Sequence, residues 1–161
     1  MLHALIATAG ASWAWASVSC FAAAILSAIF PWIAAEAVLI AFLALAHSSA
    51  EVVGVVVILS VGQMAGKAIV FWGARRGRWG QGHSSGLAAR WKERMTSRPQ
   101  QASSIVLLSS IVGFPPFFLV TFAAGAFGVS FQRFMVAGTT GRLVRFGVLA
   151  FLPHAIVHIW R

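Results

Sequence analysis

Apolar residues run along this chain in two long stretches without charge, and proline interrupts each of them. Residues 1–35 and 99–132 contain no Asp, Glu, Lys or Arg, and the prolines are Pro31 in the first stretch and Pro115-Pro116 in the second. A straight helix rising about 1.5 Å per residue over either stretch would overshoot a hydrocarbon core of about 30 Å. The pattern therefore predicts that both stretches bend at their prolines.

Two re-entrant hairpins are the structures we expect from these bends. The first is predicted near residues 28–47, because the apolar run that follows Pro31 is too short to span a bilayer comfortably. The second is predicted near residues 104–127 from the same combination of an uncharged run and a proline break.

A spanning helix is expected after each hairpin. Ser48 and Glu51 favour a helix start, since an acid in the first turn suits the positive end of the helix dipole, and this helix is predicted over about residues 50–72. The second is predicted over about residues 130–152, with Pro153 near its end.

Composition agrees with a membrane protein. The 161 residues are 60% hydrophobic and only 9% charged, whereas soluble domains carry about 25% charged residues. The mean hydropathy is +0.87. We therefore expect an all-α polytopic membrane protein, with residues 1–161 forming a single transmembrane domain.

The positive charge is concentrated in one connector, predicted over residues 74–103. Lys and Arg number 12 against three acids, a net charge of +9, and residues 75–98 hold six of these nine charges. Short loops rich in Lys and Arg stay on the inner side of a membrane, so the connector is expected to be cytoplasmic and nucleic acid is not an expected partner. Residues 87–95 form a candidate amphipathic surface helix that binds anionic lipid; a solvated loop is the alternative.

The two halves of the chain, residues 1–73 and 104–161, share an order of features. Each predicts a broken hairpin, a turn of small residues and a helix with glycines followed by a basic residue. The matching positions are Gly62, Gly66, Lys67 and Phe71 in one half and Gly138, Gly141, Arg142 and Phe146 in the other. Because the hairpins would enter from opposite faces, the order predicts an inverted repeat, a common build of secondary transporters. Chance similarity in an apolar chain is the alternative.

Four ionisable residues inside the apolar segments form the predicted substrate-binding set. A charge such as that of Glu36 costs roughly 2.5 to 3.5 kcal/mol at a helix centre. Glu36 either lies at a hairpin mouth, partly wet and paired with Lys or Arg, or lines a polar cavity. Lys67, Arg142 and Arg145 are its basic counterparts. Arg142 and Arg145 share one helix face, and planar guanidinium groups suit phosphate recognition. The alternative is that these side chains extend to the membrane–water interface.

Motifs for catalysis, cofactors and metals are absent from the sequence. There is no Gly-rich phosphate loop, nucleophile elbow, HExxH pair or carboxylate pair. His154 and His158 are four residues apart but lack further metal ligands, and Cys20, as the one cysteine, is expected to be a small buried hydrophobe. We therefore expect no enzymatic activity, no cofactor and no metal ion.

Several motifs follow one another in a recognisable order. The segment FPWIAAEAVL is a proline-containing hairpin sequence that ends in an acid, Glu36. A G-x-x-x-G-x-x-x-x-Y-x-x-G-R pattern, with Phe for Tyr and Ala for Gly, is matched by Gly62, Gly66, Phe71, Ala74 and Arg75. The segment SIVGFPPFFLVTFAAG comes next, followed by a helix, and its marker residues are Pro115, Pro116, Gly125, Phe134 and Gly141. Over about residues 30–149 the chain resembles the DedA family, whose members are also called VTT-domain or SNARE-associated Golgi proteins.

The resemblance implies a multi-pass protein of the cell (inner) membrane that moves lipids across the bilayer. In the family this means phospholipid scrambling or recycling of a polyprenyl phosphate carrier. The second hairpin of the family usually bears two arginines, whereas residues 111–118 contain none, and the family's second acid falls near Ala24. We infer that Arg142 and Arg145 replace the missing positive charge from the neighbouring helix.

The leading expectation is therefore a transporter or scramblase of a phosphate-bearing lipid, with anionic or phosphate-bearing membrane lipids as partners and a homo-oligomer as a further assembly. Two other classes remain open. One is a membrane structural or adaptor protein that uses its basic connector for docking, and the other is a proton-coupled exporter of small solutes.

Overall fold

The described part of the chain folds entirely into helices and contains no strand, which confirms the all-α prediction. The computed structural model describes residues 2–30, 33–77 and 99–159, and side chains within 13–30, 33–77 and 100–152. The helices are α1 (Leu2–Ile29), α2 (Ala35–Leu43), α3 (Ser49–Arg76), α5 (Pro99–Val112), α6 (Phe117–Ala126) and α7 (Phe131–Ile159). Pro31, the candidate surface helix at 87–95 and the side chains of His154 and His158 lie outside this description.

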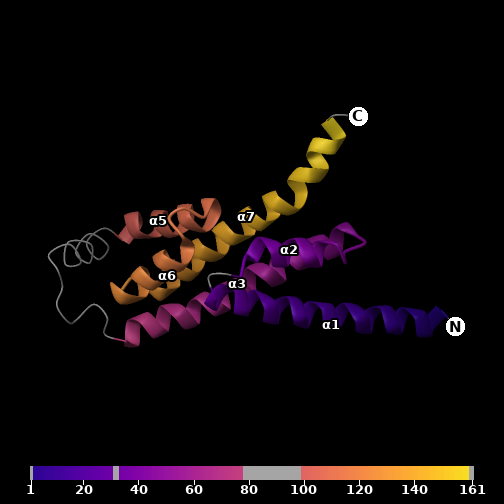
Figure 1. The fold of residues 1–161 in the computed structure, drawn as a ribbon, viewed down its shortest axis with the longest axis horizontal. Coiled ribbons are helices and arrows are strands. Elements are labelled where there is room, and N and C mark those ends of the chain that lie inside the picture. Colours follow the sequence, from indigo (N-terminus) through magenta and orange to yellow (C-terminus); the bar gives the residue numbers. More distant parts are fainter. Residues whose placement is uncertain (1, 31–32, 78–98, 160–161) are drawn as a thin grey trace.

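The described helices form two similar sets of three, and each set has a break between its first and second helix. α1 stops at Ile29 and α2 starts at Ala35, while α5 stops at Val112 and α6 starts at Phe117 after the Pro115-Pro116 pair. Helix is therefore interrupted between Ile29 and Ala35 and, as predicted, at Pro115-Pro116, whereas Pro31 itself lies outside the described residues. In Figure 1, α1 runs from one end of the molecule towards the middle and α2 turns back, while α5 and α6 do the same from the opposite end. The two breaks therefore lie close together near the middle.

Backbone and side-chain hydrogen bonds fix the turns on either side of these helices. Ser48 caps α3, its hydroxyl accepting a hydrogen bond from the Glu51 backbone, as the sequence predicted. At the end of α6, Val129 N donates to Ala124 O and Gly128 N to Gly125 O, with Gly128 at a φ of 78°. This is a Schellman motif, in which the glycine adopts a left-handed conformation that other residues avoid.

Two helices extend beyond their predicted ends. α3 runs to Arg76 rather than to residue 72, and Arg75 and Arg76 in its last turn favour the negative end of the helix dipole. α7 runs to Ile159, so the predicted end near residue 152 is wrong. Proline is tolerated inside apolar helices, where the chain kinks and continues, and Pro153 therefore does not stop this one.

Small residues bring α1 and α3 into close contact. A Cβ atom on Gly62 would lie 2.7 Å from the Cβ of Ala24, and one on Gly66 would lie 2.5 Å from that of Ala28. Both pairs advance in the same direction, so the two helices are parallel. Gly62 and Gly66 thus form a small-xxx-small contact, and the partner helix repeats the pattern as Ala-x-x-x-Ala.

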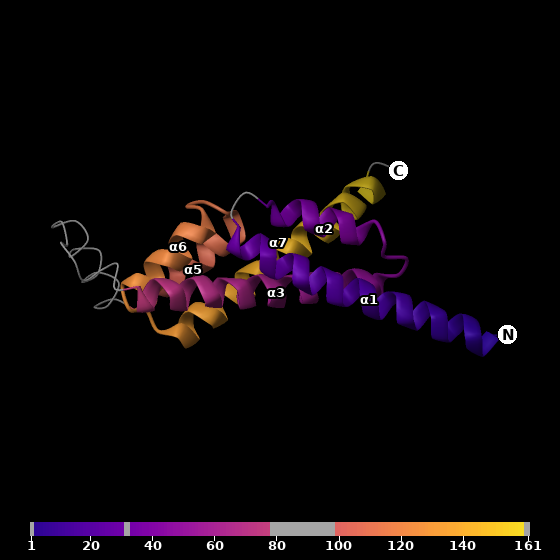
Figure 2. The same ribbon diagram turned by 60° about the horizontal axis from the view of Figure 1, so that its bottom comes forward.

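α7 packs against both α5 and α3. Gly141 lies against Ser110 and against the carbonyl of Leu107 on α5. The rings of Phe134 and Phe71 stack with centroids 4.9 Å apart, which places the start of α7 beside the end of α3. α3 and α7 are therefore antiparallel, as Figure 2 also shows.

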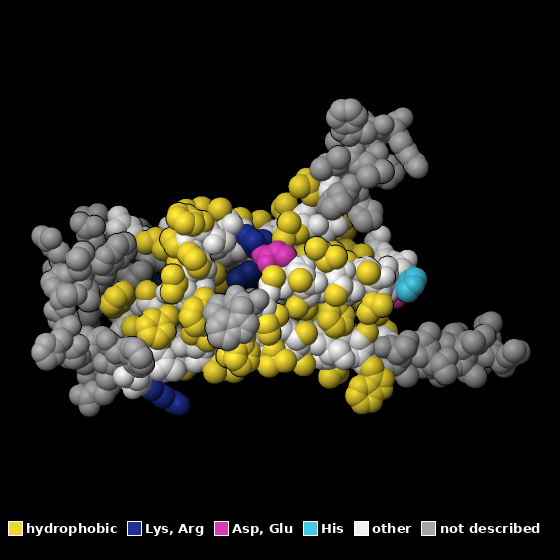
Figure 3. Space-filling model, in the orientation of Figure 1, with side chains coloured by type: hydrophobic (Ala, Val, Ile, Leu, Met, Phe, Trp, Pro, Cys, Tyr) yellow, Lys and Arg dark blue, Asp and Glu magenta, His cyan; other side chains and the backbone are white. Residues whose placement is uncertain are grey.

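The outer surface of the described residues is largely apolar. Two helical segments, Ser49–Arg76 and Phe131–Leu152, are long and apolar enough to cross a membrane by length and composition. Large hydrophobic side chains such as Phe114, Ile40 and Val136 are exposed, whereas Cys20 is buried as expected. Figure 3 shows this apolar face interrupted near its centre by one acidic side chain between basic ones.

Candidate functional site

A polar cavity lies where the two helix breaks meet. Its volume is about 230 Å³. Residues of both breaks line it, among them Ile33 and Ala34 from the first and Gly113 and Pro116 from the second. The four predicted substrate-binding residues also line it: Glu36, Lys67, Arg142 and Arg145. These four residues, from the three helices α2, α3 and α7, are thus brought together around one space, although their roles stay predictions.

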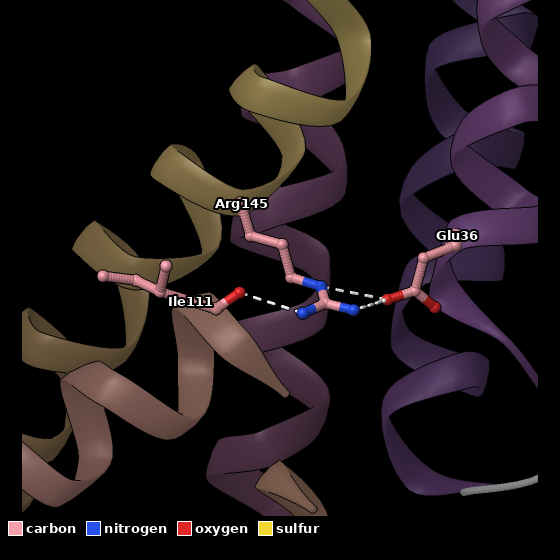
Figure 4. A network of polar contacts seen from close by, with 3 residues as sticks. All are labelled: Glu36, Ile111 and Arg145. Atoms are coloured by element: carbon pink, nitrogen blue, oxygen red, sulfur yellow. Dashed lines mark hydrogen bonds and ion pairs between the residues drawn. The ribbon is translucent and has the colours of Figure 1, made fainter. Parts of the chain in front are cut away.

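Glu36 and Arg145 join the two halves of the molecule. Nε and Nη2 of Arg145 both donate to Oε1 of Glu36, at 3.0 and 2.6 Å. The third nitrogen, Nη1, donates to the carbonyl of Ile111 at 2.9 Å. Figure 4 shows the guanidinium of α7 lying between α2 and the end of α5. Arg145 therefore connects α7 to α2 and to the end of α5.

The break between α5 and α6 is contacted by an arginine of α7. Residues 111–118 carry no arginine of their own, yet Arg145 reaches the backbone of Ile111 from α7. Gly113 lies directly against this guanidinium: a Cβ there would be 2.9 Å from Nη1, and the φ of Gly113 is 84°. Gly113 was not singled out from the sequence, although a glycine just before two prolines is a turn signal that could have indicated it.

Lys67 is buried, and its ammonium group is bound to the end of α1. Its Nζ donates to the carbonyl of Ala28 at 2.7 Å and lies 5.0 Å from the centroid of the Phe118 ring. The carbonyl is free to accept because it belongs to the last turn of α1, where no later residue of the helix can donate to it. Lys67 thus stabilises the first break while its charge faces the cavity.

Arg142 is a buried charged side chain with one nitrogen that no described residue binds. Only 8% of it is exposed, and its buried Nε has no hydrogen-bond partner among the described residues. The guanidinium carbon lies 4.8 Å from the centroid of the Phe117 ring and 5.5 Å from that of Phe146. These aromatic faces favour a cation but satisfy none of its N–H groups in their plane.

Two helix N-termini add to the positive potential of the cavity. α2 starts at Ala35 and α6 at Phe117, and the first residues of both line the cavity. Neither cap residue, Ala34 or Pro116, makes a side-chain capping hydrogen bond. Free N–H groups at a helix start attract anions. Since Lys67, Arg142 and Arg145 face the single carboxylate of Glu36, the cavity carries a net charge of two positive units.

Ser27 and Gln63 belong to the cavity but were missed by the sequence analysis. The side-chain amide of Gln63 donates to the hydroxyl of Ser27, and this hydroxyl donates in turn to the carbonyl of Ala24. Both side chains are buried. Gln63 is the one amide side chain in α3, and a lone amide inside an apolar helix is a signal that could have identified it.

The remaining motif residues lie away from the cavity or only support it. Gly62 and Gly66 pack against α1, and Gly125 packs against the backbone of Phe71. Arg75 lies at the far end of α3, where its Nη1 donates to the carbonyl of Val129 at 3.5 Å. Their contribution is to hold the helices that position the site.

Apolar helices around a positively charged cavity define the class: this is an all-helical membrane protein with a polar site between its helices. The family model of the VTT domain matches residues 30–154. The chain therefore belongs to the VTT-domain family, the DedA or SNARE-associated Golgi protein family, which is membrane-associated. No curated protein and no solved structure matches the chain.

Proposed function

We propose that this protein moves a phosphate-bearing lipid across the bilayer and that the cavity receives the phosphate group. The observation that carries the proposal is Arg142, a buried guanidinium facing the cavity with an unsatisfied N–H. An unpaired buried charge is costly, so a ligand that supplies its counter-charge is favoured. Phosphate oxygens match a planar guanidinium fork in both charge and geometry.

The proposed architecture consists of two re-entrant hairpins and two spanning helices related as an inverted repeat. The support is a shared contact pattern: Gly66 of α3 lies against Ala28 and the carbonyl of Ile25, three residues earlier, and Gly141 of α7 lies against Ser110 and the carbonyl of Leu107. The helices that carry these glycines are antiparallel, as an inverted repeat requires.

A lipid enters such a site by its head group alone. The cavity is about 230 Å³, which suits a phosphate and small substituents, and the surface around it is apolar. The acyl or prenyl chain stays in the surrounding hydrocarbon while the phosphate moves between the helix N-termini and Arg142. The tight pair of Glu36 and Arg145 borders this path, and a phosphate that reaches Arg145 competes with the carboxylate for its donors.

The proposed location is the cell (inner) membrane, with the basic connector on the cytoplasmic side. The ends of the described helices support this orientation, since Arg75 and Arg76 at the end of α3 and Arg133 at the start of α7 lie at one end of the molecule. Clustered Lys and Arg at one end follow the positive-inside pattern.

Reconstitution into liposomes tests the proposal. Purified full-length protein should accelerate flipping of labelled phospholipid or polyprenyl phosphate, and Arg142→Gln should reduce the rate roughly tenfold or more, because a charge-assisted contact to phosphate is lost. Arg76→Gln is the matched control, an exposed charge on α3 outside the cavity. If the wild-type protein flips neither lipid, the proposed function is wrong; if Arg142→Gln flips lipid normally, the assignment of the cavity is wrong.

A further inference from the structure

A second groove lies between α5 and α7, separate from the cavity at the helix breaks. Its volume is about 760 Å³, and Ser103 and Leu107 of α5 form one wall. The other wall is the first part of α7, including Arg133, Val136 and Thr140. It shares no described residue with the central cavity.

The groove exists because the two parallel helix pairs are packed unequally. α1 and α3 touch along their length, at Gly54 with Trp13, at Gly62 with Ala24 and at Gly66 with Ala28. α5 and α7 come into close contact at Gly141, and five α7 residues before it line open space beside α5: Gln132, Arg133, Val136, Ala137 and Thr140. The second pair therefore forms a wedge that opens towards the connector end.

The chemistry of the walls suits an anion with an apolar extension. Arg133 is the charged side chain among the described residues of the groove, and Ser130, Gln132 and Thr140 add hydrogen-bonding groups beside it. Leu107, Val136 and Ala137 supply an apolar lining. Of the acids that the structure describes, Glu36 is bound to Arg145 and Glu51 accepts from the backbone of His47, so neither compensates Arg133.

We propose that this groove binds the phosphate head group of an anionic membrane phospholipid, with Arg133 contacting the phosphate and the upper acyl chain against Val136 and Ala137. Its place in the fold supports this occupant over a soluble one, because Arg75 and Arg76 reach the same end of the molecule and face an anionic leaflet together with Arg133. Basic grooves between membrane helices on the cytoplasmic side are a recognised setting for such head groups. The site is independent of the transport cavity.

Thermal unfolding of the full chain in detergent, titrated with phosphatidylglycerol or with phosphatidylcholine of the same acyl chains, tests this inference. Phosphatidylglycerol should stabilise the wild-type protein at lower concentrations than phosphatidylcholine. Arg133→Gln should weaken the apparent affinity for phosphatidylglycerol about fivefold and that for phosphatidylcholine less, because the choline cation already compensates the same phosphate. Ala137→Trp, which fills the groove, should weaken both.

Control measurements separate this site from a diffuse basic surface and from the transport cavity. Arg76→Gln removes one exposed charge at the same end and should change the affinity less than about twofold; an effect equal to that of Arg133→Gln would overturn the proposal. Arg142→Gln should keep the preference for phosphatidylglycerol even where flipping is lost. An equal shift from soluble glycerol phosphate, or an unchanged preference in Arg133→Gln, would also overturn it.

Discussion

The first half of the molecule, α1 to α3, and the second half, α5 to α7, place helices alike but bring different side chains to the point where they meet. In both, a long helix follows a broken pair, and a glycine lets it touch the first helix of that pair. The first half contributes Glu36 and a lysine that is bound to Ala28 O. The second contributes two arginines, Arg145, which is bound across the halves, and Arg142, whose Nε has no hydrogen-bond partner among the described residues.

This difference separates scaffold from chemistry. The glycine contacts are similar, so they account for the position of the helices and not for selectivity. The charged side chains make different contacts. The Lys67 ammonium donates to a backbone carbonyl, and Arg145 binds both Glu36 and the carbonyl of Ile111. Arg142 faces the cavity with an unbound Nε. Two similar halves thus form a site with three different cations. Lys67 is bound to backbone, Arg145 is paired with Glu36, and Arg142 is available for a ligand.

The largest effect is expected from filling the glycine contacts. Gly66→Leu and Gly141→Leu should each destabilise the protein by about 3 kcal/mol, because a side chain there meets backbone or buried atoms that have no room to move. Unfolding in mixed micelles measures this. Gly73→Leu and Gly147→Leu are the matched controls, since nothing lies within 4 Å of a Cβ at either position. A large effect in one half alone would break the comparison of the two scaffolds.

Much of this scaffold followed from the sequence, whereas the contacts of the charges did not. Uncharged runs and prolines are local signals, and they indicated where the helices break, whereas the partner of the α3 glycines, α1, is seen only in the structure. The bond from Arg145 to Ile111 O joins residues 34 positions apart and depends on how far α7 slides along α5. The position of Arg142 beside the Phe117 and Phe146 rings depends on the same alignment of α7 with its neighbours. No sequence pattern indicates this alignment.

The next largest effect is expected from the bond that joins the halves. Arg145→Gln should destabilise the protein by about 2 kcal/mol, because it leaves Glu36 and the carbonyl of Ile111 without their shared donor. Glu36→Gln should cost less, since the carboxylate is 39% exposed and water screens its charge. A double-mutant cycle in micelles measures the coupling. Additive single effects would show that the halves are not linked through this pair.

Gly113 offers a smaller change in the second half. Gly113→Ala should destabilise by about 1 to 2 kcal/mol, because its φ of 84° is costly for a residue with a Cβ and this Cβ would press on Arg145. The hydrogen bonds from Arg145 to Glu36 should weaken as well. Comparison of the Gly113→Ala variant alone and in an Arg145→Gln background measures how much of the cost comes from the guanidinium; an undiminished cost would assign it to the backbone alone.

The smallest effect is expected at the start of α3. Ser48→Ala should destabilise by about 1 kcal/mol, because the backbone N–H of Glu51 loses its acceptor at an exposed turn. Ser49→Ala is the matched control, since its hydroxyl makes no capping contact at the start of the same helix. Flipping of lipid by Ser48→Ala should stay at the wild-type rate, because the cap lies outside the cavity. A loss of transport without a loss of stability would instead place the outer end of the first half in the lipid path, and the two halves would then differ in function as well as in charge.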